Sequence, residues 1–138
     1  MAEPSSAAFV DTNVLVRYLT DDPPALAERA ARVLESEERL VVSELVLVEA
    51  AYVLTTVYEV AREAAVDALI DLVQRRNLVL LQLDKPLALA ALRLCRSSGR
   101  VSFADAFLWA QARQAGADTV YTFDARFPSV GLARAFMP

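Results

Sequence analysis

The sequence predicts an α/β fold with a mostly parallel sheet that is covered on both faces by helices. Short runs of apolar, often β-branched residues alternate along the chain with longer segments whose apolar residues recur at helical spacing. This alternation is typical of units in which a helix returns the chain to start the next parallel strand. The chain has 138 residues, of which 56% are hydrophobic, enough for one substantial core. We therefore expect a single domain over residues 1–138, with its core at about 8–136.

The expected elements follow one another in a regular order. Strands are predicted at 8–11, 39–43, 78–83 and 119–122, and helices at 13–19, 24–37, 43–58, 61–76, 86–98 and 103–115. Helix starts are indicated by Asp22 before a proline pair, by Ser43, and by Ser102 with Asp105 three residues later, a spacing like that of a capping box. Gly116 is expected to end the last helix. The strands are apolar throughout, as burial on both faces requires.

The composition excludes several kinds of active site. The chain has one cysteine, Cys95, and no histidine, which rules out a disulfide framework, a Cys/His zinc site and catalytic Ser-His-Asp or Cys-His groups. Chemistry would therefore depend on carboxylates, hydroxyls, arginines or Lys85. The longest apolar zone, residues 40–61, contains three glutamates and makes a poor membrane span. With no export signal at the N-terminus and a single thiol, we expect a cytoplasmic protein without a membrane partner.

Charge is distributed unevenly along the chain. The net charge is −4, but residues 1–84 hold seven arginines and fifteen acids, a balance of −8, whereas residues 85–138 have a balance of +4. The acidic total argues against storage on nucleic acid through many cationic phosphate contacts. It is compatible with a metal-dependent enzyme that acts on nucleic acid, because bound cations change the local charge.

Four acids stand at positions suited to a shared site. Asp11 ends the first strand and Asp124 lies just beyond the fourth, and ligands in such folds bind beyond the carboxyl ends of parallel strands. Glu49 lies in a helix that is apolar nearly all round and is expected to be largely buried, and Asp105 lies in a similarly apolar first turn. Each has a structural alternative. The three aspartates suit helix or turn caps, and Glu49 suits a salt bridge to an arginine.

Together the four acids favour a metal site. If they face one crevice, their mutual repulsion destabilises the fold unless divalent cations bind there. Oxygen ligands favour Mg²⁺ or Mn²⁺. Paired cations about 4 Å apart are a recurring means of cleaving phosphodiesters, and they need no histidine base.

At these residues the sequence resembles the PIN domain, and within it the VapC-type toxins of bacterial toxin–antitoxin pairs. The resemblance rests on four segments in order, which read "FVDTNVLVRYL" (9–19), "VSELVLVEAAYVL" (42–54), "VSFADAFLWAQARQAG" (101–116) and "VYTFDARF" (120–127). It covers the chain from about residue 8 to 136. It implies a three-layer α/β/α sandwich around a short, mostly parallel central sheet.

The resemblance also implies a function. It implies endoribonuclease activity dependent on Mg²⁺ or Mn²⁺, in which metal-activated water cleaves RNA such as tRNA or rRNA. It further implies a role as the toxin of a type II pair, a cognate antitoxin and a homodimer. RNA contact is expected to depend on the Arg-richer C-terminal part, at Arg93, Arg96, Arg100 and Arg126. The implied metal and catalytic residues are Asp11, Glu49, Asp105 and Asp124, supported by Asn13 and Thr122.

Two other functions are considered. A receiver-type signalling domain also clusters acids around Mg²⁺ and has a Lys-Pro pair, which Lys85 and Pro86 imitate, but that pair follows the last strand of a receiver and here precedes a further helix and strand. A non-catalytic interaction module would use the apolar 43–58 helix as a contact face and the acids as caps and ion pairs.

Overall fold

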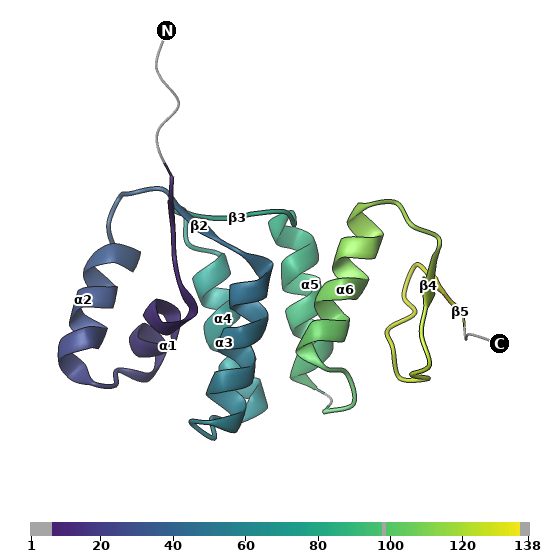
Figure 1. Cartoon of the computed structure of the whole chain (residues 1–138), viewed down its shortest axis with the longest axis horizontal. Helices are drawn as coiled ribbons and strands as arrows, with labels where there is room; N and C mark the ends of the chain where they lie inside the picture. The colour runs from purple at the N-terminus through teal and green to yellow at the C-terminus, as the bar shows by residue number, and fades with distance from the viewer. Residues whose placement is uncertain (1–6, 98, 136–138) are drawn as a thin grey trace, which may run out of the picture.

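The strands and helices follow the predicted order in a computed structural model that describes residues 7–97 and 99–135 (Figure 1). The strands are β1 (Ala8–Phe9), β2 (Leu40–Val42), β3 (Leu78–Leu80), β4 (Thr119–Tyr121) and β5 (Ala133–Ala135). The helices are α1 (Thr12–Thr20), α2 (Pro24–Leu34), α3 (Glu44–Thr56), α4 (Arg62–Val73), α5 (Lys85–Arg96) and α6 (Phe103–Gln114). Every predicted strand and helix is present, and β5 is a strand that the sequence did not predict.

The strands form two separate parallel sheets within the described residues. One has the order β1-β2-β3, with Ala8 opposite Leu40 and Leu40 opposite Leu78. The other pairs β4 with β5, with Thr119 opposite Ala133. Six helices with a short parallel sheet are the components expected of a three-layer α/β/α sandwich, and the predicted fold class is confirmed.

Two strands, β1 and β4, differ from the prediction that the strands are buried. In β4, Thr119 and Tyr121 are exposed and Val120 is partly buried. All three residues of β2 are buried, as expected for a central strand, but both residues of β1 are exposed and the side chain of Phe9 is 65% accessible. The reason is that β1 pairs with β2 on one side and forms the edge of its sheet. Burial begins at the next residue, Val10.

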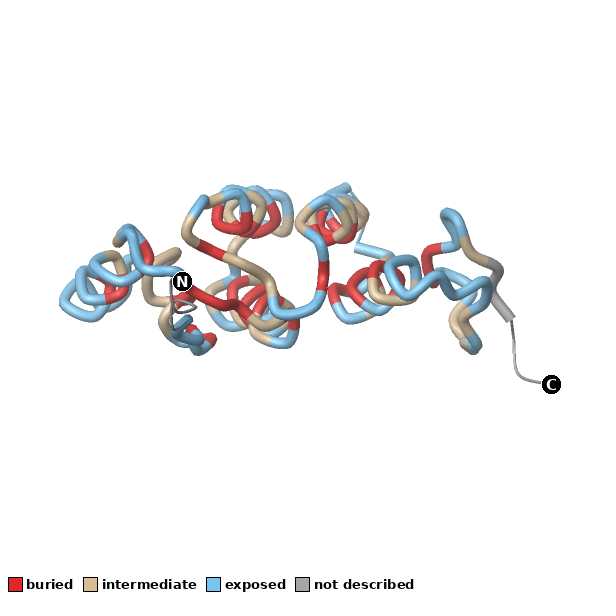
Figure 2. Tube along the Cα trace, turned by 90° about the horizontal axis from the view of Figure 1, so that it is seen from above, coloured by how far each residue is buried: buried red, intermediate tan, exposed pale blue. Residues whose placement is uncertain are grey.

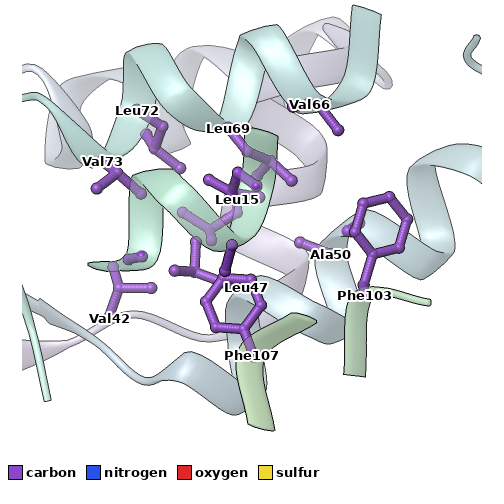
Figure 3. Close-up of a cluster of buried hydrophobic side chains, with 14 of the residues drawn as sticks. Leu15, Val42, Leu47, Ala50, Val66, Leu69, Leu72, Val73, Phe103 and Phe107 are labelled. Atoms are coloured by element: carbon purple, nitrogen blue, oxygen red, sulfur yellow. The ribbon is translucent and has the colours of Figure 1, made fainter. Parts of the chain in front are cut away.

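The core lies between the helices and β2. Figure 3 shows aliphatic side chains from α3 and α4 meeting the rings of Phe103 and Phe107 from α6, with Val42 of β2 alongside. Leu47 and Leu69 are fully buried. Each buried leucine side chain contributes about 2 kcal/mol from the removal of apolar surface from water. Seen from above, the helices in the middle of the molecule lie in two rows, with buried residues on the sides that face one another (Figure 2).

Most of the predicted caps are present. Ser43 Oγ accepts a hydrogen bond from Leu45 N at 3.2 Å, and Ser102 Oγ accepts one from Asp105 N at 3.0 Å. Gly116 ends α6 with a φ of +74°, a conformation that glycine adopts without strain. The prediction for Asp22 is wrong, because Pro23 is the N-cap of α2 and no side chain caps that helix. Asp22 lies one residue too early to reach the first free amides of α2.

The two sheets lie far apart along the molecule. In both views the long axis is horizontal, with α1 and α2 toward one end and β4 and β5 at the other (Figures 1 and 2). The helices α3, α4, α5 and α6 lie between them, and α6 contacts β4. None of the helices in the described part of the chain is long and apolar enough to span a membrane.

Candidate metal and active site

Asp11 is both a helix cap and an exposed carboxylate. It follows β1, with extended backbone angles (φ −81°, ψ 158°), and is the N-cap of α1. Its Oδ1 accepts a hydrogen bond from Thr12 N at 2.7 Å. The capping alternative is therefore confirmed. The same contact orients the carboxylate at the carboxyl end of β1, where the sequence placed a candidate ligand.

Glu49 is exposed, so the prediction that it is largely buried is wrong. The buried face of α3 consists of residues spaced at three and four, namely Leu47, Ala50, Ala51 and Leu54, and Glu49 lies off that face. Its Oε2 accepts a hydrogen bond from Thr12 Oγ1 at 3.1 Å. No salt bridge to Glu49 is found within the described residues, so the arginine partner considered for it is absent there.

The buried acid of α3 is Glu44, which the sequence reasoning did not select. It is 4% exposed, and its carboxylate accepts hydrogen bonds from Gln82 N at 3.1 Å and from Leu83 N at 2.9 Å. Helical spacing could have found it, because Glu44 stands three residues before Leu47 and seven before Ala51 on the buried face. Its role is structural, since it holds the segment after β3 against the start of α3.

Asp11 and Glu49 line the same pocket. This pocket, the acid pocket, has a volume of about 400 Å³ and lies among α1, α3 and the segment that follows α3. Thr12 is buried and bonds to both carboxylates, one through its amide and the other through its hydroxyl. The lining residues are Asp11, Thr12, Asn13, Val16, Arg17, Glu49, Val53, Val57 and Tyr58. Asn13, predicted as a supporting residue, therefore also lines the acid pocket.

Asp105 lies in the first turn of α6 and beside a buried thiol. Burial raises the pKa of Cys95 to about 11, an effect that Arg62 opposes and the charge of Asp105 reinforces. Cys95 is thus protonated at neutral pH and is no nucleophile. Arg62 lies 4.5 Å above the Phe103 ring and donates to the carbonyl oxygens of Cys95 and Val101, which anchors the segment leading into α6.

Asp124 lies in the turn after β4. Its amide donates to Thr122 Oγ1 at 3.0 Å, and its Oδ1 accepts from Arg126 N at 2.8 Å and forms an ion pair with Arg126 Nε at 3.4 Å. The turn-capping alternative is thus confirmed. Thr122, predicted as a supporting residue, is a direct partner of Asp124. The catalytic role of both stays a prediction.

The structure brings two of the four predicted acids together. Asp11 and Glu49 share the acid pocket, whereas Asp105 and Asp124 are not among its lining residues. Within residues 7–97 and 99–135, no group of three or more acidic, cysteine or histidine side chains is arranged to hold a metal ion. For Asp124 the physical reason is the split sheet, because β4 pairs with β5 and not with β1. The assignment of all four acids to one site therefore stays a prediction.

The acid pocket offers two carboxylates as oxygen ligands for a divalent cation. Magnesium in proteins keeps several water ligands and is bound through one or two carboxylates, which Asp11 and Glu49 supply. The amide oxygen of Asn13 and the hydroxyl of Thr12 add further oxygen atoms to the pocket wall. The carboxylates of this pocket alone are too few for the paired cations considered above.

The arginines selected for RNA contact are partly neutralised. Arg96 forms a two-bond ion pair with Asp67, at 2.8 and 3.0 Å, and Arg126 pairs with Asp124. Arg17, which the prediction left out, lines the acid pocket and donates to the Tyr58 hydroxyl at 3.1 Å. Arg17 stands four residues after Asn13, so the two lie on the same face of α1, and this relation could be predicted from the sequence.

Lys85 provides no support for a receiver-type site. It begins α5, and its Nζ donates to the carbonyl oxygen of Arg75 at 2.9 Å. It is not among the residues that line the acid pocket.

Asp11 and Glu49 place two carboxylates in one pocket near the carboxyl end of β1, and such oxygen ligands are compatible with a divalent cation. The comparison with protein families identifies the particular class. The PIN domain family matches residues 8–132, and the chain belongs to that family. PIN domains are generally metal-dependent nucleases. No curated protein matches the chain.

Proposed function

We propose that this PIN domain is an Mg²⁺- or Mn²⁺-dependent endoribonuclease and the toxin of a type II toxin–antitoxin pair. The observation that carries the proposal is the joint placement of Asp11 and Glu49 in one pocket, linked through Thr12, in a chain of this family. Asp105 and Asp124 complete the proposed set of acids. The RNA substrate, tRNA or rRNA among the candidates, the cognate antitoxin and a cytoplasmic location belong to the same proposal.

The residues of the acid pocket have separate roles in this mechanism. When bound, a divalent cation supplies an activated water and stabilises the negative charge that develops on the phosphate. Thr12 fixes both carboxylates from one buried position, which limits their motion before RNA binds. Arg17 is held in place by Tyr58, so its guanidinium brings positive charge to the pocket wall beside the phosphate.

The test is RNA cleavage by purified variants. We expect wild-type protein to cleave RNA with Mg²⁺ or Mn²⁺ and to lose this activity in EDTA. Asp11→Ala and Glu49→Ala should each lose more than the roughly 10- to 100-fold that removing a supporting contact costs at a metal site. Glu37→Ala is the matched control, because Glu37 is an exposed acid outside the acid pocket.

Retained cleavage by both pocket variants would overturn the proposal and would favour the non-catalytic interaction module. Asp105→Ala and Asp124→Ala, measured in the same assay, decide whether the two distant acids take part. Sequencing of RNA ends after brief expression of the protein would identify the cleaved RNA. Coexpression with a small adjacent reading frame that suppresses this cleavage would support the toxin role.

A further inference from the structure

A second pocket adjoins the acid pocket. It has a volume of about 410 Å³, lies between α1 and α2, and shares Asn13 and Arg17 with the acid pocket. We call it the arginine pocket. Its lining residues are Asn13, Val14, Arg17, Leu26, Arg29, Ala30 and Val33. A ligand that occupies the acid pocket can therefore continue into the arginine pocket along α1.

Two guanidinium groups give this pocket its charge. Arg17 donates to the Tyr58 hydroxyl at 3.1 Å and to the carbonyl oxygen of Asp22 at 3.3 Å, and both partners are uncharged oxygen atoms. In the part of the chain that the structure describes, the guanidinium group of Arg29 makes no hydrogen bond or ion pair. Arg32, three residues later on α2, is paired with Glu28 at 3.2 Å. Arg29 is thus the cation of α2 that is available to a ligand.

The remaining wall is apolar and partly open to solvent. Leu26 is 40% exposed and Val33 is 42% exposed, and both line the pocket beside Ala30. Guanidinium groups recognise phosphates through charge-assisted hydrogen bonds, and an apolar wall accommodates a base or a sugar. A nucleotide presents both features, and single-stranded RNA running from a cleavage site presents them at each step.

We propose that the arginine pocket binds a nucleotide of RNA next to the scissile phosphate, with its phosphate on Arg17 and Arg29 and its base against Leu26 and Val33. This inference rests on the proposed ribonuclease function, because the RNA is positioned by its contact with the acid pocket. Arg29 is then a positioning residue, which contributes to RNA affinity and not to the bond cleavage itself.

The test compares Arg29→Ala with Arg32→Ala. The probe is a fluorescein-labelled single-stranded RNA oligonucleotide of mixed sequence, whose binding is followed by fluorescence anisotropy in EDTA at several salt concentrations. We expect Arg29→Ala to weaken binding about tenfold, the cost of one charge-assisted hydrogen bond. We also expect it to reduce the slope of log affinity against log salt by about 0.7, the value for one phosphate contact to a single strand. Arg32→Ala should change neither quantity.

Cleavage kinetics in Mg²⁺ provide a second readout. Arg29→Ala should raise KM about tenfold and leave kcat close to the wild-type value, since the residue binds RNA equally well before and during cleavage. Arg29→Lys keeps the charge and should preserve the salt slope while recovering part of the affinity. Thermal unfolding of all three variants should match that of the wild type, because both arginines are exposed.

The outcomes separate this inference from the proposed function. Wild-type protein that binds RNA through Arg29 but does not cleave it contradicts the ribonuclease proposal and leaves the nucleotide pocket in place. Active wild-type protein whose RNA affinity and KM are unchanged by Arg29→Ala overturns the nucleotide pocket alone. That second result is also the one expected if the arginine pocket serves a protein partner.

Discussion

Glu44 is buried, and backbone amides of a distant segment donate the hydrogen bonds that stabilise its carboxylate. It is 4% exposed and is bonded to the amides of Gln82 and Leu83, which are 38 and 39 residues away. A buried carboxylate without such donors would be destabilising. The bonds therefore allow Glu44 to occupy the apolar face of α3 and to connect the N-terminus of α3 with the segment after β3.

We predict that Glu44→Gln lowers the free energy of unfolding by about 2 kcal/mol. Both amides reach the same oxygen, Oε2, so a glutamine oxygen can accept both bonds, but it lacks the negative charge that strengthens them. The glutamine NH2 group would also replace Oε1, which accepts from Gln82 N at 3.2 Å. Urea denaturation in EDTA measures the change, and Glu38→Gln, at an exposed acid, is the control. An equal stability of the two variants would contradict a structural role for Glu44.

At the scale of the element, Asp11 has two roles. It caps the N-terminus of α1, and it supplies one of the carboxylates of the acid pocket. Asp11 Oδ1 accepts from Thr12 N, and the helix that begins there carries Asn13 and Arg17 into the two pockets. The capping role and the proposed metal role thus concern one group. They can be separated, because asparagine caps helices about as well as aspartate but has no charge.

We predict that Asp11→Asn abolishes RNA cleavage without a loss of stability, whereas Asp11→Ala loses the activity and about 1 kcal/mol of stability. Urea denaturation in EDTA and the cleavage assay measure the two effects. Ser43→Ala is a matched control, because it removes the side-chain cap of α3 and leaves the acid pocket intact. If Asp11→Asn cleaves RNA as the wild type does, Asp11 is a cap and nothing more.

At the scale of the whole molecule, both sheets have an open edge. β1 has a strand neighbour on one side, β4 pairs with β5 alone, and Phe9 and Tyr121 are 65% and 71% exposed. In Figure 1, β4 lies toward one end of the molecule, and the purple segment that leads down into α1 lies well away from it. Parallel strands are normally buried, so open edges favour pairing with another chain. The charge balances of −8 for residues 1–84 and +4 for residues 85–138 favour a head-to-tail approach of two copies.

We predict that the homodimer implied by the family resemblance forms by pairing β1 of one copy with β4 of the other. In a Cys95→Ala background, Phe9→Cys with Tyr121→Cys should then give a covalent dimer on mild oxidation. Leu45→Cys, at an exposed residue of α3, is the control for random cross-linking. A disulfide that forms within one chain at every protein concentration would contradict this arrangement. A protein that stays monomeric in light scattering would contradict it as well.

The same arrangement has a consequence for the acids. Parallel pairing of β1 with β4 of a second copy would place Asp11 and Asp124 at the same sheet edge, from two chains. Inactive Asp11→Ala and Asp124→Ala proteins should then regain cleavage activity when mixed, because a mixed dimer contains one complete set of acids. The absence of recovery would show that each chain assembles its acids by itself.

Local features of the chain were predictable because their causes lie within a few residues. Helical spacing and the caps Ser43 and Ser102 depend on contacts between neighbouring residues, and they indicated α3 and α6 correctly. The strand β5 was missed because "ARA" contains no β-branched or aromatic residue, and its pairing with β4 is a long-range contact.

The sequence by itself determined the alternation of strands and helices, the absence of histidine and disulfide chemistry, and the position of Asp11 at a strand end. Only the tertiary structure decided that Glu49 is exposed and joined to Thr12, 37 residues away, while Glu44 is buried. It also decided that β4 lies apart from β1, and with it Asp124 from Asp11. The physical reason is that spacing along the chain specifies local conformation, whereas strand pairing and burial depend on which distant segments meet.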